Sequence, residues 1–331
     1  MKNLLVIGGS GYIGTTLIPK LLRNYNIINI DNLIYGQKDE NSFFCKKNKL
    51  SNYVHLKKDL RNIEKLKFNK KNLLGVIILG GLVGDPITKK YSQLSKKINR
   101  DGIKKCIDFF KNEKLKLIFV STCSNYGLRK KSEPAKESSQ LKPLSLYSKD
   151  KVFIENYLKN NAKKFKFSFT ILRFATAFGV SPKMRFDLSI SDFTHQMFFK
   201  KKITVYDPNT WRPYCHVKDF AKMIFITLKS KEKYVKNEIY NVGSNINNFT
   251  KKKIISEISK IIPNVSVNYL KNDIDPRNYK VNFSKVKGKL KFNQDYSVQF
   301  GIKELIKNFK RGKFKNVTYL GNYNIKKWKN Y

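Results

Sequence analysis

Acidic residues are scarce in this chain of 331 residues, in which 24 Asp and Glu stand against 68 Lys and Arg. The formal net charge of +44 excludes a strongly acidic, self-repelling protein. Arginine is scarce as well, with nine among the 68 basic residues. Surfaces that bind phosphates usually favour Arg, because its planar fork bonds them bidentately. The lysines come with abundant Asn, Ile, Tyr and Phe, so they indicate an AT-rich genome as much as a polyanionic partner.

The chain also has few potential metal ligands, with four cysteines and three histidines. They lie apart, at positions 45, 106, 123 and 215 and at positions 55, 195 and 216, and form no C-x-x-C pair. This spacing supports neither a zinc site nor a disulfide framework. The apolar stretch Leu4–Ile7 is too short for a signal peptide, and no run approaches the roughly 18 apolar residues of a membrane span. We therefore expect a reduced, soluble, cytoplasmic protein with no membrane segment and no metal.

Continuous apolar runs alternate with amphipathic segments over the first half of the chain. Strands that are apolar throughout, rather than at every second residue, are typical of a parallel sheet covered on both faces. We expect strands at Leu4–Ile7, Ile27–Ile30, Val54–Leu56, Val76–Leu79, Leu117–Ser121 and Phe169–Phe174, and helices at Ile13–Leu22, Leu94–Phe110 and Lys149–Leu158. The predicted fold is α/β, a Rossmann-type doubly wound parallel sheet with a smaller mixed α/β C-terminal lobe.

The second half of the chain predicts how this lobe is divided. From Gly179 to Pro213 the pattern is irregular, and a helix (His216–Leu228) and a buried strand (Ile239–Val242) then return to the sheet. Two further helices are expected at Thr250–Ile261 and Val298–Phe309. We assign residues 1–177 and 214–245 to a nucleotide-binding domain, 178–213 and 246–321 to a substrate-binding lobe, and 322–331 to a loose tail.

Glycines follow the first predicted strand and begin the first predicted helix. Gly9, Gly11 and Gly14 satisfy G-x-G-x-x-G, and Gly8 adds a second spacing. Such a turn lets the backbone approach a pyrophosphate, which the helix N-terminus then attracts. A glycine turn that merely starts a helix is the alternative, but Asp31 ends the second strand about 20 residues later. An acid there bonds the adenosine ribose and favours NAD over NADP.

Tyr147 and Lys151 are four residues apart, so they share one helix face. An ammonium near a phenol favours the phenolate, which gives a general base. By itself this spacing is weak evidence, because 18 Tyr and 59 Lys give roughly three such pairs by chance and the chain has five. Only Tyr147 begins a predicted helix after a strand that ends in hydroxyl residues, among them Thr122. Open parallel sheets bind ligands at the edge formed by the carboxyl ends of their strands, so Thr122 could hold a substrate hydroxyl against the Tyr147 oxygen.

With these residues in place, the chain resembles the extended short-chain dehydrogenase/reductase family, the NAD-dependent nucleotide-sugar epimerases and dehydratases, from Met1 to about Phe309. The motifs that carry the resemblance are Gly8–Gly14, Asp31–Leu33, Ser121–Gly127, Tyr147–Lys151 and Trp211–Asp219. The resemblance implies Tyr147 as base, Lys151 as the residue that binds the nicotinamide ribose, and Thr122 as the hydroxyl partner. It also implies a homodimer packed through two helices per subunit.

The same resemblance implies the residues that bind NAD and the substrate. Those expected to bind NAD are Gly8, Gly11, Tyr12, Ile13, Gly14, Asp31, Asn32, Asp59, Leu60, Gly80 and Lys151. An ordinary turn aspartate is an equally good interpretation of Asp59. Those expected to bind a nucleotide-diphosphate sugar are Thr176, Arg185, Arg212 and Arg277.

Departures from the family pattern narrow the chemistry. The 4,6-dehydratases carry Asp-Glu after the catalytic Thr, whereas this chain has Cys123 and Ser124, which disfavours dehydration. The 4-epimerases usually carry Asn where this chain has Thr176, which puts ordinary UDP-galactose epimerisation in doubt. The segment Leu172–Leu188 looks more like a subgroup that includes C4-oxidising GDP-heptose dehydrogenases.

Two functions from different classes remain. The first is an enzyme of surface-polysaccharide sugar biosynthesis that oxidises C4 of a nucleotide-diphosphate sugar with NAD, as an epimerase or a 4-dehydrogenase. The second is a non-catalytic dinucleotide sensor or polyanion binder. Lysine pairs are spread along the chain rather than clustered, so we expect no specific nucleic acid.

Overall fold

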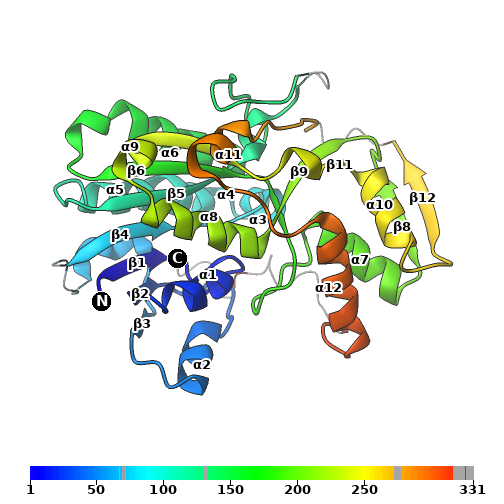
Figure 1. The fold of residues 1–331 in the computed structure, drawn as a ribbon, viewed down its shortest axis with the longest axis horizontal. Coiled ribbons are helices and arrows are strands. Elements are labelled where there is room, and N and C mark those ends of the chain that lie inside the picture. Colours follow the sequence, from blue (N-terminus) through cyan, green and yellow to red (C-terminus); the bar gives the residue numbers. More distant parts are fainter. Residues whose placement is uncertain are drawn as a thin grey trace.

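Seven parallel strands form the central sheet of the computed structural model, in the order β10-β6-β5-β4-β1-β2-β3 (Figure 1). The structure describes residues 1–66, 68, 70, 72–129, 133–271, 277–315 and 325. The strands are β1 (Asn3–Ile7), β2 (Asn26–Ile30), β3 (Tyr53–Leu56), β4 (Leu73–Ile78), β5 (Lys116–Thr122), β6 (Ser168–Phe174) and β10 (Glu238–Val242). The order confirms the predicted Rossmann-type sheet, with β10 added beside β6, and it reverses between β1 and β4.

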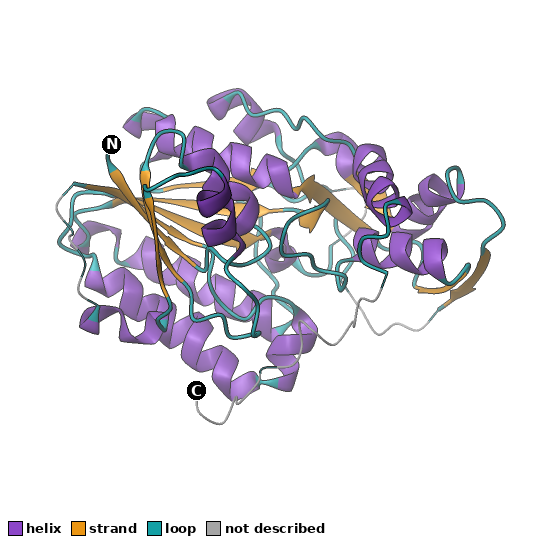
Figure 2. Cartoon of the chain, turned by 90° about the horizontal axis from the view of Figure 1, so that it is seen from below, coloured by secondary structure: helices purple, strands orange, loops and turns teal. Residues whose placement is uncertain are grey.

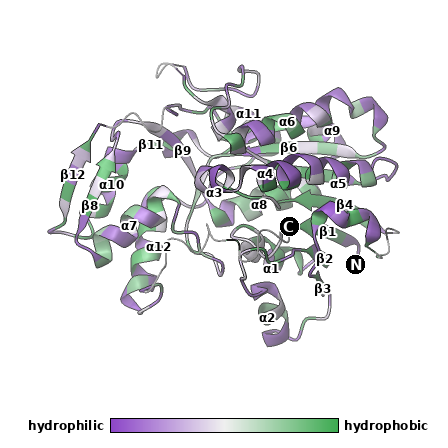
Figure 3. Ribbon diagram, turned by 180° about the vertical axis from the view of Figure 1, so that it is seen from behind, coloured by the Kyte–Doolittle hydropathy of each residue, from purple (hydrophilic) through white to green (hydrophobic). Residues whose placement is uncertain are grey.

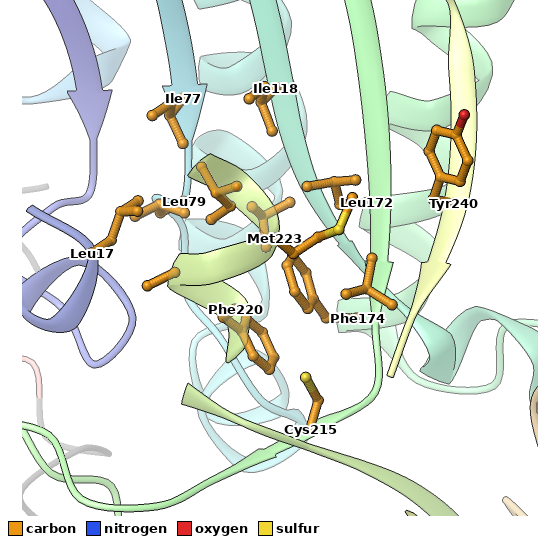
Figure 4. Close-up of a cluster of buried hydrophobic side chains, with 14 of the residues drawn as sticks. Leu17, Ile77, Leu79, Ile118, Leu172, Phe174, Cys215, Phe220, Met223 and Tyr240 are labelled. Carbon is orange, nitrogen blue, oxygen red and sulfur yellow. The ribbon is translucent and has the colours of Figure 1, made fainter. Parts of the chain in front are cut away.

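Both faces of the sheet are buried, which explains the continuous apolar runs. Leu4 and Val6 of β1 face one core, with Leu17 of α1 and Met223 of α8, while Leu5 and the residues alternating with it face the opposite core. Figure 2 shows the two helical layers, and Figure 4 shows α8 packed over the strands in the first core. The helices of these layers include α1 (Gly14–Leu21), α5 (Ile103–Phe109), α6 (Leu146–Asn160), α8 (Val217–Lys229) and α11 (Ser284–Leu290).

Most predicted helices are present, with shifted ends. The segment predicted as one helix, Leu94–Phe110, consists of α4 (Ser92–Ser95), a π-helical stretch (Lys96–Gly102) and α5. The short helices α2 (Glu40–Lys47), α3 (Asp85–Lys90) and α9 (Glu232–Val235) were not predicted from the sequence. Within the described ranges, no helix is both long and apolar enough to cross a membrane.

A smaller lobe packs beside the carboxyl ends of the central strands (Figure 1). Its two small sheets have the orders β11-β9-β7 and β12-β8. Its core lies between three helices that carry both hydrophobic and hydrophilic segments (Figure 3). The elements are β7 (Thr176–Phe178), α7 (Ser189–Phe199), β8 (Lys202–Tyr206), β9 (Trp211–His216), β11 (Asn248–Thr250), α10 (Lys251–Ser259), β12 (Ser266–Leu270) and α12 (Val298–Lys310).

The prediction that Gly179–Pro213 is irregular is wrong. The segment contains α7 and β8 and the start of β9. In α7, Ile190, Phe193 and Met197 lie three and four residues apart and pack into the core of the lobe, so the segment has a helical apolar period that the sequence analysis overlooked. Of the predicted tail 322–331, the structure describes only Ile325, which is 4% exposed and donates its N–H to the Tyr91 hydroxyl.

Candidate active site

A cleft of about 520 Å³ lies at the carboxyl edge of the central sheet, between the sheet and the smaller lobe. This is the place where open parallel sheets bind ligands. Of the seventeen site residues expected from the sequence, Lys151 alone is absent from the lining; it is buried behind it. The sixteen that line the cleft are Gly8, Gly11, Tyr12, Ile13, Gly14, Asp31, Asn32, Asp59, Leu60, Gly80, Thr122, Tyr147, Thr176, Arg185, Arg212 and Arg277.

The glycine-rich turn between β1 and α1 is built for close backbone approach. Gly8 has a positive φ of 83°, and a Cβ there would lie 2.4 Å from the Cα of Gly80. A Cβ on Gly14 would lie 2.2 Å from the Gly9 carbonyl oxygen, so the helix could not pack on the turn. A Cβ on Gly11, by contrast, would meet only the Gly8 carbonyl oxygen, at 3.5 Å. The turn therefore leaves open space above its backbone, which fits a dinucleotide pyrophosphate.

The acid that follows β2 is fixed beside this turn. Asp31 accepts hydrogen bonds from the backbone N–H of Ser10 (3.0 Å) and of Leu33 (2.9 Å). Burial raises the pKa of Asp31, and the two backbone N–H groups oppose this rise. Both bonds fix the carboxylate at the cleft wall, where a ribose hydroxyl could reach it.

Asp59, unlike Asp31, uses its carboxylate mainly for bonds to side chains and to its own loop. It caps the short turn after β3 by accepting from the Arg61 N–H at 2.9 Å, and it also binds the Arg61 guanidinium. Asn32 donates to its second oxygen at 3.2 Å. Burial alone would raise the pKa of Asp59, but the bonds from Arg61 and Asn32 lower it. These contacts fit the interpretation of Asp59 as a turn residue, although it lines the cleft.

Helix α6 carries the predicted Tyr–Lys pair. Ser145 is the N-cap of this helix and forms a reciprocal capping box with Ser148. Tyr147 therefore lies in the first turn of the helix. The Lys151 amine lies 5.8 Å from the centre of the Tyr147 ring and donates to the Val120 carbonyl of β5 at 2.7 Å.

Thr122 stands at the end of the same strand. Its Oγ1 accepts a hydrogen bond from the Ser124 N–H at 3.1 Å, which leaves the hydroxyl proton to be donated to another group. Thr122 and Tyr147 thus line one cleft from two neighbouring elements.

The pKa of the phenol differs from the sequence-based expectation. Burial raises the pKa of Tyr147, the Arg185 cation opposes this, and Asp85 and Tyr279 add to it. The expected lowering by Lys151 is absent because desolvation dominates and the amine is directed to the Val120 carbonyl. Burial also lowers the pKa of Lys151 to about 8, so its ammonium form still dominates at pH 7 but is lost a little above neutral pH.

The three expected arginines line the cleft from segments that are far apart in the sequence. Arg185 binds both carboxylate oxygens of Asp187, and Arg277 forms an ion pair with Asp85. Arg212 donates to the backbone carbonyl of Arg277, which joins two of the arginines. Three guanidinium groups in one cleft match the planar, bidentate recognition of phosphate.

Asp85 and Asp187 are cleft residues that the sequence analysis missed. Asp85 directly follows Gly84, which has a positive φ of 109°, in the loop after β4. Its place at the same sheet edge as Thr122 is the signal that could have identified it. Asp187 has no comparable signal, because it lies in the segment that the sequence presented as irregular.

The two residues after Thr122 point in different directions. Cys123 is buried in the core, where its thiol donates to the Arg173 carbonyl at 3.1 Å and burial raises its pKa. Ser124 lines the cleft, and the Tyr279 hydroxyl donates to it at 3.4 Å.

The fold and the cleft together define a dinucleotide-binding protein with a Thr, Tyr and Lys set at its switch point. The chain belongs to the NAD dependent epimerase/dehydratase family, whose model matches residues 4–243. This confirms the expected family and NAD as the cofactor. A UDP-glucose 4-epimerase from Lacticaseibacillus casei is 23% identical to it over 296 residues, which are 78% of this chain and 81% of that one.

Solved structures have a similar fold over nearly the whole length of this chain. The UDP-glucuronic acid 4-epimerase from Bacillus cereus, in complex with UDP-glucuronic acid and NAD, is 25% identical, with a TM-score of 0.82 over 93% of this chain and 99% of that one. The dTDP-glucose 4,6-dehydratase from Bacillus anthracis, in complex with NAD, shares the fold at 23% identity, with a TM-score of 0.80 over 94% and 97%.

Proposed function

We propose that this chain oxidises the C4 hydroxyl of a nucleotide-diphosphate sugar with NAD, as an epimerase or as a dehydrogenase that releases the 4-keto sugar. The observation that carries the proposal is one cleft that contains a glycine-rich turn, a Thr–Tyr pair and three arginines. A cytoplasmic place in surface-polysaccharide sugar biosynthesis is part of the same proposal and rests on the family resemblance.

The turn from Gly8 to Gly14 would hold the pyrophosphate of NAD, and Asp31 would accept from the adenosine ribose. Lys151 would donate to the nicotinamide ribose from behind the cleft wall. When bound, the nicotinamide accepts a hydride from the sugar and can return it.

The proton of the C4 hydroxyl would pass to the Tyr147 oxygen, which must therefore be a phenolate when the sugar reacts. Thr122 would donate its hydroxyl proton to the C4 oxygen and keep that oxygen in line with Tyr147. The Arg185 cation is the strongest local charge that favours the phenolate. Burial opposes ionisation, so Tyr147 would become a base only when further positive charge enters the cleft.

The diphosphate would bind Arg277 and Arg212, with Arg185 nearer the sugar. Each of Arg277 and Arg185 holds a carboxylate in this structure, so the diphosphate would compete with Asp85 and Asp187 for them. Phosphate offers more acceptor oxygens than a carboxylate, and bidentate Arg–phosphate pairs are strong.

Dehydration would need an acid and a base beside the C5–C6 bond. Cys123 points into the core and donates to a carbonyl, and Ser124 is a weak acid. These side chains support C4 oxidation without loss of water, although 4,6-dehydratases share the fold.

The test is a panel of UDP-, GDP-, CDP- and dTDP-sugars, followed by NADH absorbance and product mass. A two-hydrogen loss in mass with growing absorbance identifies a dehydrogenase, and an isomer without net absorbance identifies an epimerase. Tyr147→Phe should lower kcat by about 10²–10⁴-fold. Tyr157→Phe is the matched control, because Tyr157 lies on the same helix with its hydroxyl bonded to Asp108 and should keep wild-type turnover.

Full turnover by Tyr147→Phe would refute the proton step. If no sugar reacts and the protein instead holds nucleic acid at about 150 mM salt, the polyanion-binding alternative would be favoured.

A further inference from the structure

Asp85 places a carboxylate in the cleft, where it forms an ion pair with Arg277. It begins α3, directly after the loop that follows β4, and its side chain lines the cleft together with Tyr147. Its charge is felt at the reacting group, because Asp85 is among the few charges that act on the Tyr147 phenol. A sugar whose C4 oxygen reaches Tyr147 would therefore lie in the cleft that Asp85 also lines, within the range of its charge.

The negative charge of Asp85 is only partly offset. One oxygen forms an ion pair with Arg277, whereas Oδ1 is buried and receives no hydrogen bond from the described part of the chain. The second cleft carboxylate that an arginine holds, that of Asp187, differs because the Arg185 guanidinium donates to both of its oxygens. Of these two carboxylates, Asp85 is the one whose charge remains to act on a ligand.

Binding of the substrate would expose this charge further. In the proposed function Arg277 grips the diphosphate, and a guanidinium shared with two phosphates offsets the carboxylate less than one held in a single ion pair. The cleft would then present a negative charge to the sugar during the reaction.

We infer that Asp85 determines substrate specificity by excluding sugars that carry a carboxylate at C6, so that the chain uses neutral hexoses and deoxyhexoses and rejects hexuronic acids. C6 is attached to C5, the ring neighbour of C4, so a C6 carboxylate must lie near Tyr147 and hence near Asp85. Two like charges in a partly desolvated cleft repel each other, while a neutral CH₂OH or CH₃ group meets no such penalty. This inference rests on the proposed function, since it assumes that C4 faces Tyr147.

The test compares pairs of nucleotide sugars that differ only at C6. The pairs are UDP-glucose with UDP-glucuronic acid, dTDP-glucose with dTDP-glucuronic acid, and GDP-mannose with GDP-mannuronic acid. The ratio of kcat/KM for the neutral member to that for the acid should exceed about tenfold in the wild type. In Asp85→Asn this ratio should fall by about tenfold or more, mainly because the acid becomes a better substrate.

Two further variants separate charge from structure. Asp85→Glu keeps the charge and should keep the preference for the neutral sugar. Asp101→Asn removes the same charge from an exposed site outside the cleft and should leave the ratio unchanged. Thermal unfolding and NAD binding, measured for each variant, show whether Asp85→Asn is folded, and the ratio is insensitive to a uniform loss of activity.

A wild-type chain that uses a hexuronic acid as well as its neutral partner would overturn the inference and leave the proposed function intact. The same holds if Asp85→Asn keeps the wild-type ratio. If no member of any pair is bound or oxidised, the proposed function and this inference both fail.

Discussion

Lys151 lies in an environment that is unusual for a lysine. Its amine is buried, lies 4.7 Å from the centre of the Phe119 ring and donates to the Val120 carbonyl. Desolvation lowers its pKa to about 8, with Glu155 and Asp150 opposing the shift. The ammonium form therefore dominates at pH 7 and is lost as the pH rises through about 8.

This predicts a pH-dependent affinity for NAD. If Lys151 donates to the nicotinamide ribose as a cation, the dissociation constant for NAD should rise about fivefold to tenfold between pH 7 and pH 9.5. Titration of intrinsic fluorescence with NAD at several pH values measures this directly. In Lys151→Met the affinity should be weaker and nearly independent of pH over the same range.

Lys149→Met serves as the control, because Lys149 is exposed and lies two residues before Lys151 on α6. It should show the wild-type pH dependence. The assignment of Lys151 to the ribose would be wrong if the NAD affinity of the wild type stayed constant up to pH 9.5.

Asp31 gives a second prediction at this scale. Asp31→Asn keeps an acceptor oxygen for only one of the Ser10 and Leu33 N–H groups, and it removes the charge that would repel a 2′-phosphate. We expect NAD to bind about tenfold more weakly, and the preference for NAD over NADP to fall by at least that factor. Dissociation constants for both cofactors, measured side by side, give the two numbers. An unchanged preference would mean that other residues select the cofactor.

Among the elements, helix α6 connects local sequence to the site most directly. The reciprocal bonds between Ser145 and Ser148 fix where it starts, and the start decides which face of the helix carries Tyr147 and Lys151. Ser145→Ala should lower the free energy of unfolding by about 1 kcal/mol and the melting temperature by roughly 2–4 °C. It should also lower kcat, because the first turn carries the phenol.

Differential scanning calorimetry and steady-state kinetics on the same preparation test this prediction. Ser51→Ala, an exposed serine just before β3, is the control and should change neither quantity. A variant at Ser145 with wild-type melting and turnover would show that tertiary contacts alone position the helix.

The sequence predicted the elements whose signal is local. β1 and β4 to β6 were recognisable because both faces of the sheet are covered, α1 because glycines precede it, and α6 because its residues have helical periodicity. The helix α2 was missed because Phe43 and Phe44 are exposed, so it lacks an apolar stripe. The π-helical stretch Lys96–Gly102 was missed because no residue pattern marks a widened turn.

In the candidate site, too, some features follow from local sequence and others only from the packing of the folded chain. Thr122 and Tyr147 were predicted because a strand end and a helix start place them at one edge of the sheet. The pairing of Arg277 with Asp85 could not be predicted, because the two residues are far apart in sequence and meet only through the packing of the lobe. The direction of the pKa shift of Tyr147 was also beyond the sequence, since it depends on burial.

At the scale of the whole molecule, the two lobes are joined directly over the glycine-rich turn. The Tyr12 hydroxyl donates to the Gly179 carbonyl at 2.7 Å, and Ser181 donates back to the Tyr12 carbonyl at the same distance. The segment that enters the smaller lobe is thus tied to the loop expected to hold the cofactor.

A second junction forms around Glu304 of α12. One oxygen accepts from the Val180 N–H at 2.9 Å and contacts His216 Nε2 at 3.0 Å, while the other accepts from Lys218 at 2.6 Å. His216 also caps α8 by accepting from the Lys218 N–H, which explains this histidine as a structural residue. One carboxylate thus connects the lobe to the helix that returns to the sheet.

This junction predicts a stability that depends on pH. Burial alone would raise the pKa of Glu304, but the bonds from His216, Lys218 and Val180 lower it to about 2 from 4.5. A lowered carboxyl pKa contributes stability above about pH 4.5, and this contribution is lost as the pH falls toward 2. Glu304→Gln should therefore unfold about 2–4 °C below the wild type at pH 7. This value allows for the 15% of the Glu304 side chain that is exposed to solvent. The gap in melting temperature should narrow steadily below pH 4.5. Calorimetric scans of both proteins from pH 3 to pH 7 measure the gap. Glu257→Gln, whose carboxylate forms an ion pair with the exposed Lys260 three residues later, should show a smaller gap. A gap of constant size across this range would mean that Glu304 acts through packing rather than charge.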